Sequence, residues 1–123
     1  MSVDENLVVD SGCSQSILMN KNLLSNYQNF NLKMSSADNG TLQCIGFGDL
    51  VINQHLTLKD VLHCPTVSMN LLSTTQLYDQ GFKIQHLKNE IHILRDRKFI
   101  LRARRSGGLY FISLTTFPQA FRR

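Results

Sequence analysis

Residues 7–12 read Leu7-Val8-Val9-Asp10-Ser11-Gly12, a short apolar run followed at once by an acid, a hydroxyl and a glycine. The apolar run predicts a buried strand, and the small residues after it leave the Asp10 carboxyl free for acid–base chemistry. A single carboxylate cannot efficiently both activate a water and protonate a leaving amine. No second Asp-Ser-Gly or Asp-Thr-Gly occurs in the 123 residues, so a partner acid would come from a second copy of the chain. The motif therefore predicts a symmetric homodimer.

Length and composition are those of one globular domain, residues 1–123. The chain is 42% hydrophobic and 18% charged, which argues against a disordered and against a fibrous protein. Its apolar runs are too short to cross a bilayer, so we expect no membrane partner. The acidic stretch 1–5 lacks the basic start and apolar core of a secretory signal, which favours an intracellular, cytoplasmic protein or a piece of a larger one.

The cysteine pattern also favours an intracellular protein. Cys13, Cys44 and Cys64 are odd in number and cannot form a complete disulfide framework, and none of their spacings is Cys-x-x-Cys. His63-Cys64 is the only adjacent pair of metal-ligand types, whereas a zinc site needs four donors at regular spacing. We expect neither a metal nor another cofactor.

A basic stretch lies at residues 95–105, with six Lys or Arg residues against Asp96 alone. A nucleic-acid-binding protein could use it, but the stretch lacks interleaved aromatic residues and a recognition helix, and the chain has no tryptophan. We favour a solvated strand and turn whose charges discourage edge-to-edge aggregation, with nucleic-acid binding as the alternative.

Short apolar segments separated by turn signals predict an all-β fold. Apolar residues alternate with polar ones over 30–34, and the apolar pattern resumes at Leu42. The Asn39-Gly40 pair between them favours a type I′ turn and hence a protruding hairpin. We expect a bend bracketed by Gly46 and Gly48. Further strands are expected at 50–52, 56–62, 70–72, 82–87, 91–94, 99–103 and 109–114.

One short helix is expected over 74–80. Ser73-Thr74-Thr75-Gln76 has the pattern of a capping box, in which Ser73 caps the open amides and Gln76 reaches back. Gly81 would end the helix in the left-handed conformation. The strand at 70–72 would then lead directly into this helix.

The order of these parts resembles the retropepsin family. More narrowly, it resembles the protease segment of copia-type LTR-retrotransposon polyproteins over about residues 6–114, leaving 115–123 as a tail. The segments that carry the resemblance are Val9-Asp10-Ser11-Gly12, Ala37-Asp38-Asn39-Gly40, Gly46-Phe47-Gly48, Asp60-Val61-Leu62-His63-Cys64-Pro65, Met69-Asn70-Leu71-Leu72-Ser73 and Gly108-Leu109-Tyr110.

The resemblance implies a closed β-barrel with a flap hairpin and one short helix, active as a homodimeric aspartic endopeptidase. The two Asp10 carboxyls would face each other at about 3 Å and share one proton, because like charges so close cannot both ionise. They would activate a water without a covalent intermediate, in a mildly acidic pH window. Ser11 would bond across the dimer, and Gly12 would permit close approach of the backbone.

The resemblance also implies where an extended polyprotein peptide would bind. The flap residues Ala37, Asp38, Asn39 and Gly40 would close over the peptide, which adds a strand to the sheet. Val67, Met69 and Leu71 would form the wall of the side-chain pockets, with ordinary core packing as an equal alternative. In a retrotransposon, the protein would act in virus-like particles.

Other interpretations stay open. Residues 10–12 could form a plain β-turn, and the hairpin could be a simple surface turn. The domain could also be a captured, inactive binding or scaffolding module. Two positions depart from the family pattern, Cys13 in place of a residue such as alanine and Ser73 in place of the glycine of many retroviral relatives.

Overall fold

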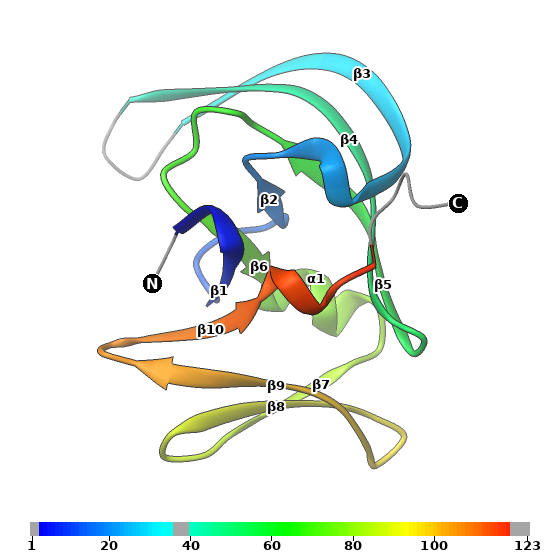
Figure 1. Cartoon of the computed structure of the whole chain (residues 1–123), viewed down its shortest axis with the longest axis vertical. Coiled ribbons are helices and arrows are strands. Elements are labelled where there is room, and N and C mark those ends of the chain that lie inside the picture. The colour runs from blue at the N-terminus through cyan, green and yellow to red at the C-terminus, as the bar shows by residue number, and fades with distance from the viewer. Residues whose placement is uncertain (1–2, 36–39, 119–123) are drawn as a thin grey trace.

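The fold is almost entirely β-strand in the computed structural model, which describes residues 3–35 and 40–118 (Figure 1). The expectation of an all-β protein with one short helix is confirmed for these residues, and no helix among them is long and apolar enough to span a membrane. The strands are β1 (Asn6–Asp10), β2 (Ile17–Leu18), β3 (Leu24–Ser35), β4 (Thr41–Asn53), β5 (Leu56–His63), β6 (Asn70–Ser73), β7 (Lys83–His86), β8 (Glu90–Arg95), β9 (Lys98–Ser106) and β10 (Leu109–Ser113). The helix is α1 (Thr74–Asp79), and 3-10 turns occur at Val3–Glu5, Lys21–Leu23 and Leu114–Thr116.

All ten strands belong to one sheet, in the order β3-β4-β5-β2-β6-β1-β10-β9-β8-β7. The long β3–β4 hairpin arches over the top of the molecule in Figure 1, β7, β8 and β9 form the bottom, and β1 and β6 lie between them. Within residues 3–35 and 40–118, the ladder ends at β3 and β7, and no pairing joins these two strands. The pairing therefore does not confirm the predicted closed barrel.

Strand β1 lies in the middle of the sheet between a parallel and an antiparallel neighbour. It runs parallel to β6, with Asp10 opposite Ser73, and antiparallel to β10, with Val8 opposite Phe111. The last four strands form the expected antiparallel meander. The C-terminal part of the chain therefore supplies β10, one of the two strands that flank the strand of Asp10.

Two clusters of buried side chains hold the sheet together. The main core contains fully buried residues from both halves of the chain, such as Leu7, Leu58 and Ile93. A smaller group, here called the satellite cluster, is made of Ile17, Leu42, Cys44, Leu62 and Cys64. Several half-buried apolar side chains, among them Met34, Val67 and Leu71, pack against the satellite cluster.

Gly46 and Gly48 lie inside the continuous strand β4, and the pairing of β4 with β5 shifts register directly after Gly48. A β-carbon at Gly46 would lie 2.8 Å from the carbonyl oxygen of Gln28, and one at Gly48 would lie 2.7 Å from that of Ser25. Both distances are shorter than those that β-carbons keep from non-bonded atoms in real proteins. The glycines are needed because β3 approaches β4 too closely for a side chain.

The helix begins as expected, but half of the predicted capping box is wrong. The Ser73 hydroxyl accepts a hydrogen bond from the Gln76 N–H at 3.1 Å, which is the predicted cap. The Gln76 side chain does not reach back, because its Oε1 accepts from the Ser16 N–H at 3.0 Å instead. Gly81, with a φ of +90°, ends the helix as predicted.

The basic stretch forms a turn at 96–97 and an exposed strand, as expected, but this strand is not at an edge of the sheet. Strand β9, which carries most of it, lies between β8 and β10. Part of its charge is engaged within the fold. Arg95 donates to the Gln80 carbonyl at 2.6 Å and lies 3.8 Å from the ring centre of Phe82, and Arg102 pairs with Glu90 at 3.5 Å.

Candidate functional site

Asp10 is the last residue of β1 and begins a tight turn. Its Oδ1 accepts a hydrogen bond from the Gly12 N–H at 2.7 Å. A β-carbon at Gly12 would lie 3.2 Å from the same oxygen, so a side chain there would crowd the carboxylate. The carboxylate is thus held by its own turn, with Asp10 half-buried and Ser11 and Gly12 exposed.

A groove of about 690 Å³ opens beside this turn. Its walls come from the turn, from the two arms of the β3–β4 hairpin and from the loop between β5 and β6. Most of the predicted site residues meet there, namely Asp10, Gly12, Gly40, Val67, Met69 and Leu71. Ser11 is exposed and does not line the groove, and Ala37, Asp38 and Asn39 lie outside the described residues.

Asp10 is the only acidic residue that lines this groove within the described parts of the chain. The walls are mostly apolar or carry hydroxyl groups. Sequence reasoning missed Ile17, Met34 and Leu42, although Met34 and Leu42 are direct partners across β3 and β4. The alternation on both arms of the hairpin was the signal that could have placed them on one face.

Cys13 follows the turn and lines the groove beside Asp10. Burial and the negative charge of Asp10 raise the pKa of the Cys13 thiol to about 11. The side chain is therefore a neutral thiol at physiological pH and a poor nucleophile. In the part of the chain that the structure describes, no group of three or more His, Cys, Asp or Glu side chains is placed to hold a metal ion.

The part of the chain that forms this groove matches a known family. Residues 7–82 match the model of the Pol polyprotein, beta-barrel domain. The chain belongs to this family. The match covers more than half of the chain and includes the Asp10 turn, the β3–β4 hairpin and the loop that walls the groove. The protein is therefore part of a retroelement Pol polyprotein. No curated protein and no solved structure matches the chain.

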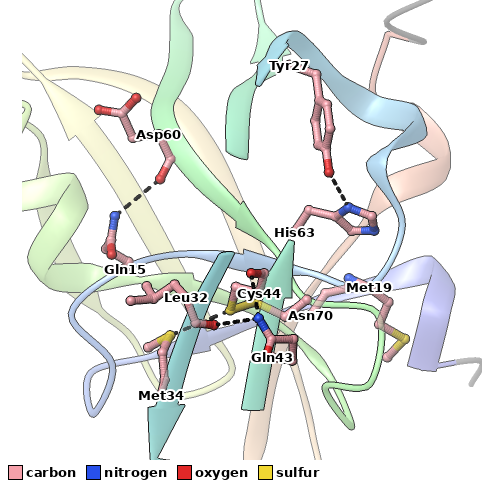
Figure 2. Close-up of a disulfide and its surroundings, with 11 residues drawn as sticks. Gln15, Met19, Tyr27, Leu32, Met34, Gln43, Cys44, Asp60, His63 and Asn70 are labelled. Atoms are coloured by element: carbon pink, nitrogen blue, oxygen red, sulfur yellow. Dashed lines mark hydrogen bonds between the residues drawn. A yellow bond between two sulfur atoms is a disulfide. The ribbon is translucent and has the colours of Figure 1, made fainter. Parts of the chain in front are cut away.

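A disulfide lies in the satellite cluster of this Pol polyprotein domain (Figure 2). It joins Cys44 of β4 to Cys64, the residue after β5, and both cysteines are fully buried. Cys13 is left free, in keeping with the odd number of cysteines. The Met34 sulfur lies 3.6 Å from that of Cys44, a contact and not a hydrogen bond, since a disulfide sulfur carries no proton. Nothing in the cysteine spacing predicted this pairing, and because disulfides are rare in cytosolic proteins, it removes the support that the cysteines gave to an intracellular location.

Ile17 and Leu42 of the satellite cluster also line the groove of the Pol polyprotein domain, as do Met34, Val67 and Leu71 packed against it. The disulfide therefore braces the groove wall from behind.

His63, next to the disulfide, is buried and accepts a hydrogen bond at Nδ1 from the Tyr27 hydroxyl, with 2.7 Å between the atoms (Figure 2). We assign this direction because the ring donates its other hydrogen bond to the Met19 backbone, and a neutral ring has one donor and one acceptor nitrogen. Burial lowers the pKa of His63, a hydrogen bond with the Met19 backbone partly offsets this, and the Lys21 charge lowers the pKa further. The ring is neutral at pH 7 and links β5 to β3.

A second, smaller hollow of about 180 Å³ lies near the N-terminus. Asp4, Glu5 and the asparagines Asn20, Asn22 and Asn70 are among its lining residues. It contains none of the predicted site residues. We place the candidate site of the Pol polyprotein domain in the larger groove, because that groove contains Asp10 and the residues expected to surround it.

Proposed function

We propose that this Pol polyprotein domain is one half of an aspartic endopeptidase of the copia type, completed by a second copy of the chain. One observation carries the proposal: a groove of about 690 Å³, large enough for a peptide segment, contains a single carboxylate, that of Asp10, at the end of a central strand. Water activation between carboxyl groups needs two of them. A two-fold axis beside the turn would supply the second.

The chemistry would follow from the pair of Asp10 side chains. At a separation of about 3 Å, like charges cannot both persist, so the pair would share one proton. The ionised member would polarise a water, which attacks the peptide carbonyl while the protonated member donates toward the carbonyl oxygen. The proton would then pass to the leaving nitrogen. The pH limits of cleavage would belong to the pair and not to either residue alone.

The substrate would be an extended segment of the element's own polyprotein. The β3–β4 hairpin borders the groove with Ser35, Gly40 and Thr41, and would act as the flap that closes over the peptide. The apolar walls at Val67, Met69 and Leu71 would receive its side chains. Processing would take place inside the cell, in the cytoplasm or in virus-like particles.

The proposal is tested by sedimentation of the purified chain together with peptide cleavage from pH 4 to 7. We expect a dimer that cleaves, and an Asp10→Asn variant that is still dimeric but at least about 10³-fold slower, because the shared proton and the charge are lost. The matched control is Asp60→Asn. Asp60 is exposed, lies outside the groove and has a φ of 56°, which asparagine tolerates.

Other results would favour the alternative functions. Peptide binding without cleavage by the wild type, equal in Asp10→Asn, would indicate a binding or scaffolding module. Nucleic-acid binding that weakens steeply with salt and is unchanged in Asp10→Asn would indicate a role for the basic stretch 95–105. An entirely monomeric wild type that still cleaves would contradict the two-copy mechanism.

A further inference from the structure

A buried hydroxyl network ties the Asp10 turn to the start of helix α1. Ser16 and Ser73 are both fully buried, and the Ser16 Oγ accepts the Ser73 N–H at 2.9 Å. The Ser73 Oγ donates to the Cys13 carbonyl at 2.8 Å and accepts from the Gln76 N–H. Gln76 closes the network by accepting the Ser16 N–H. One serine therefore caps the helix and holds the turn at the same time.

The bond from Ser73 matters because the turn has few other attachments. Gly12 and Cys13 bond back to Asp10 itself, so those bonds shape the turn without fixing it to the rest of the fold. Within residues 3–35 and 40–118, the Ser73 hydroxyl makes the one hydrogen bond that reaches residues 11–14 from another element. Ser73 is also the direct neighbour of Asp10 across the β1–β6 pair. The Asp10 turn is therefore tied to β6 twice, by the strand pairing at Asp10 and by the Ser73 hydroxyl at Cys13.

We propose that Ser73 is a positioning residue for Asp10, which it holds at the groove through the Cys13 carbonyl. This inference rests on the proposed endopeptidase function for its effect on catalysis, but not for its effect on the turn. A hydroxyl that is both donor and acceptor is needed, because the Cys13 carbonyl accepts and the Gln76 N–H donates. A capping residue without a donor would keep the helix and release the turn.

Ser73→Gly is the variant that separates these two roles. Glycine is nearly as good a helix cap as serine, so the helix should persist, while the donor to Cys13 is lost. We expect kcat to fall about 10–100-fold with KM changed less than about threefold, because a small displacement of a catalytic group slows chemistry while the groove walls stay in place. Ser73→Thr keeps the hydroxyl and should restore most of the rate.

Alkylation of Cys13 by iodoacetamide provides a readout that needs no activity, because Cys13 is the free cysteine. In the wild type, burial and the Asp10 charge should keep this reaction slow. If Ser73 anchors the turn, Ser73→Gly should react about tenfold faster, since the thiol gains exposure and moves toward its ordinary acidity. If Ser73 acts only as a local partner that lowers the thiol pKa, its loss would leave alkylation equal or slower.

The controls distinguish the inference from general destabilisation. Ser113→Ala removes another serine that caps a turn, at the opposite end of β1, where it pairs with Asn6, and should change neither readout. Ser16→Ala removes the acceptor of the Ser73 N–H and should follow Ser73→Gly in direction. Equal alkylation and equal kcat in wild type and Ser73→Gly would overturn the inference. A wild type without cleavage would overturn the proposed function alone, and alkylation would still decide whether Ser73 holds the turn.

Discussion

At the residue scale, His63 couples the fold to pH. It is buried, its pKa is lowered by burial and by Lys21, and its ring accepts a proton only at a cost to the folded state. The unfolded chain has no such restraint and takes up the proton near pH 6.5, the ordinary value for histidine. In that range the unfolded state binds more protons than the folded one, so stability falls as pH decreases below about 6.5.

We therefore predict that His63→Gln reduces the pH dependence of stability. The free energy of unfolding of the wild type, measured in urea at pH 7, 6 and 5, should fall with decreasing pH, and the fall should be smaller in the variant. His55→Gln is the matched control, because His55 is exposed in the turn between β4 and β5. A variant with the same slope as the wild type would contradict the prediction. The result bears on function, since the proposed cleavage lies in the same pH range.

At the scale of the elements, the close approach of β3 to β4 leaves no room for a side chain at Gly46. Gly46→Ala should reduce the free energy of unfolding by about 1–3 kcal/mol, because its methyl group would meet the Gln28 carbonyl and the Tyr27 hydroxyl. Gly108→Ala is the control, since nothing lies within 4 Å of a β-carbon there. Urea unfolding measures both. If the two variants lost the same free energy of unfolding, the close contact of β3 with Gly46 would not explain the loss, and the prediction would be wrong.

The same elements show which parts of the fold could be read from the sequence. The meander from β7 to β10 was predicted because its pairings are local and its turns carry clear residue signals, such as Ser106-Gly107-Gly108, where Gly107 has a φ of +64°. The parallel pairing of β1 with β6 was not predicted, since it joins residues about sixty positions apart. Strand β2 has only two residues and therefore no periodicity to detect.

The candidate site, like the fold, could be predicted from the sequence only in part. The Asp10 turn was evident from the motif alone, and the wall residues at Val67, Met69 and Leu71 came from the family resemblance. The structure adds what depends on distant contacts, such as the bond from Ser73 to the turn and the Cys44–Cys64 disulfide behind the groove. Three cysteines allow several pairings, and spacing alone does not choose among them.

At the scale of the whole molecule, the Cys44–Cys64 disulfide should stabilise both the fold and the groove. The bond spans 20 residues, so its loss in the double variant Cys44→Ala/Cys64→Ala should cost about 3 kcal/mol by the chain-entropy relation. Peptide affinity should weaken as well, because the satellite cluster forms part of the groove wall. Urea unfolding with and without a thiol reductant provides the test.

The controls for this prediction use the same cysteines. Reduced wild type should unfold at nearly the urea concentration of the double variant, and Cys13→Ala should behave as the wild type does. A midpoint that does not move on addition of reductant, with thiol titration showing full reduction, would contradict a stabilising role.

The residues that match the family model do not include all the residues that form the sheet and the main core. The match ends at Phe82, yet β10 pairs with β1, and the main core includes buried residues beyond that point, namely Ile91, Ile93, Ala103, Ile112, Leu114 and Phe117. Burial of each large aliphatic or aromatic side chain contributes about 1.5–3 kcal/mol, so their joint loss approaches the 5–15 kcal/mol typical of a whole domain. A chain of residues 1–82 should therefore not fold, as judged by far-UV circular dichroism and by hydrogen exchange, whereas the full chain of 123 residues should give the native signal. A cooperative unfolding transition in the shorter chain would show that the matched region is stable without β7–β10, and that the Asp10 strand does not need β10.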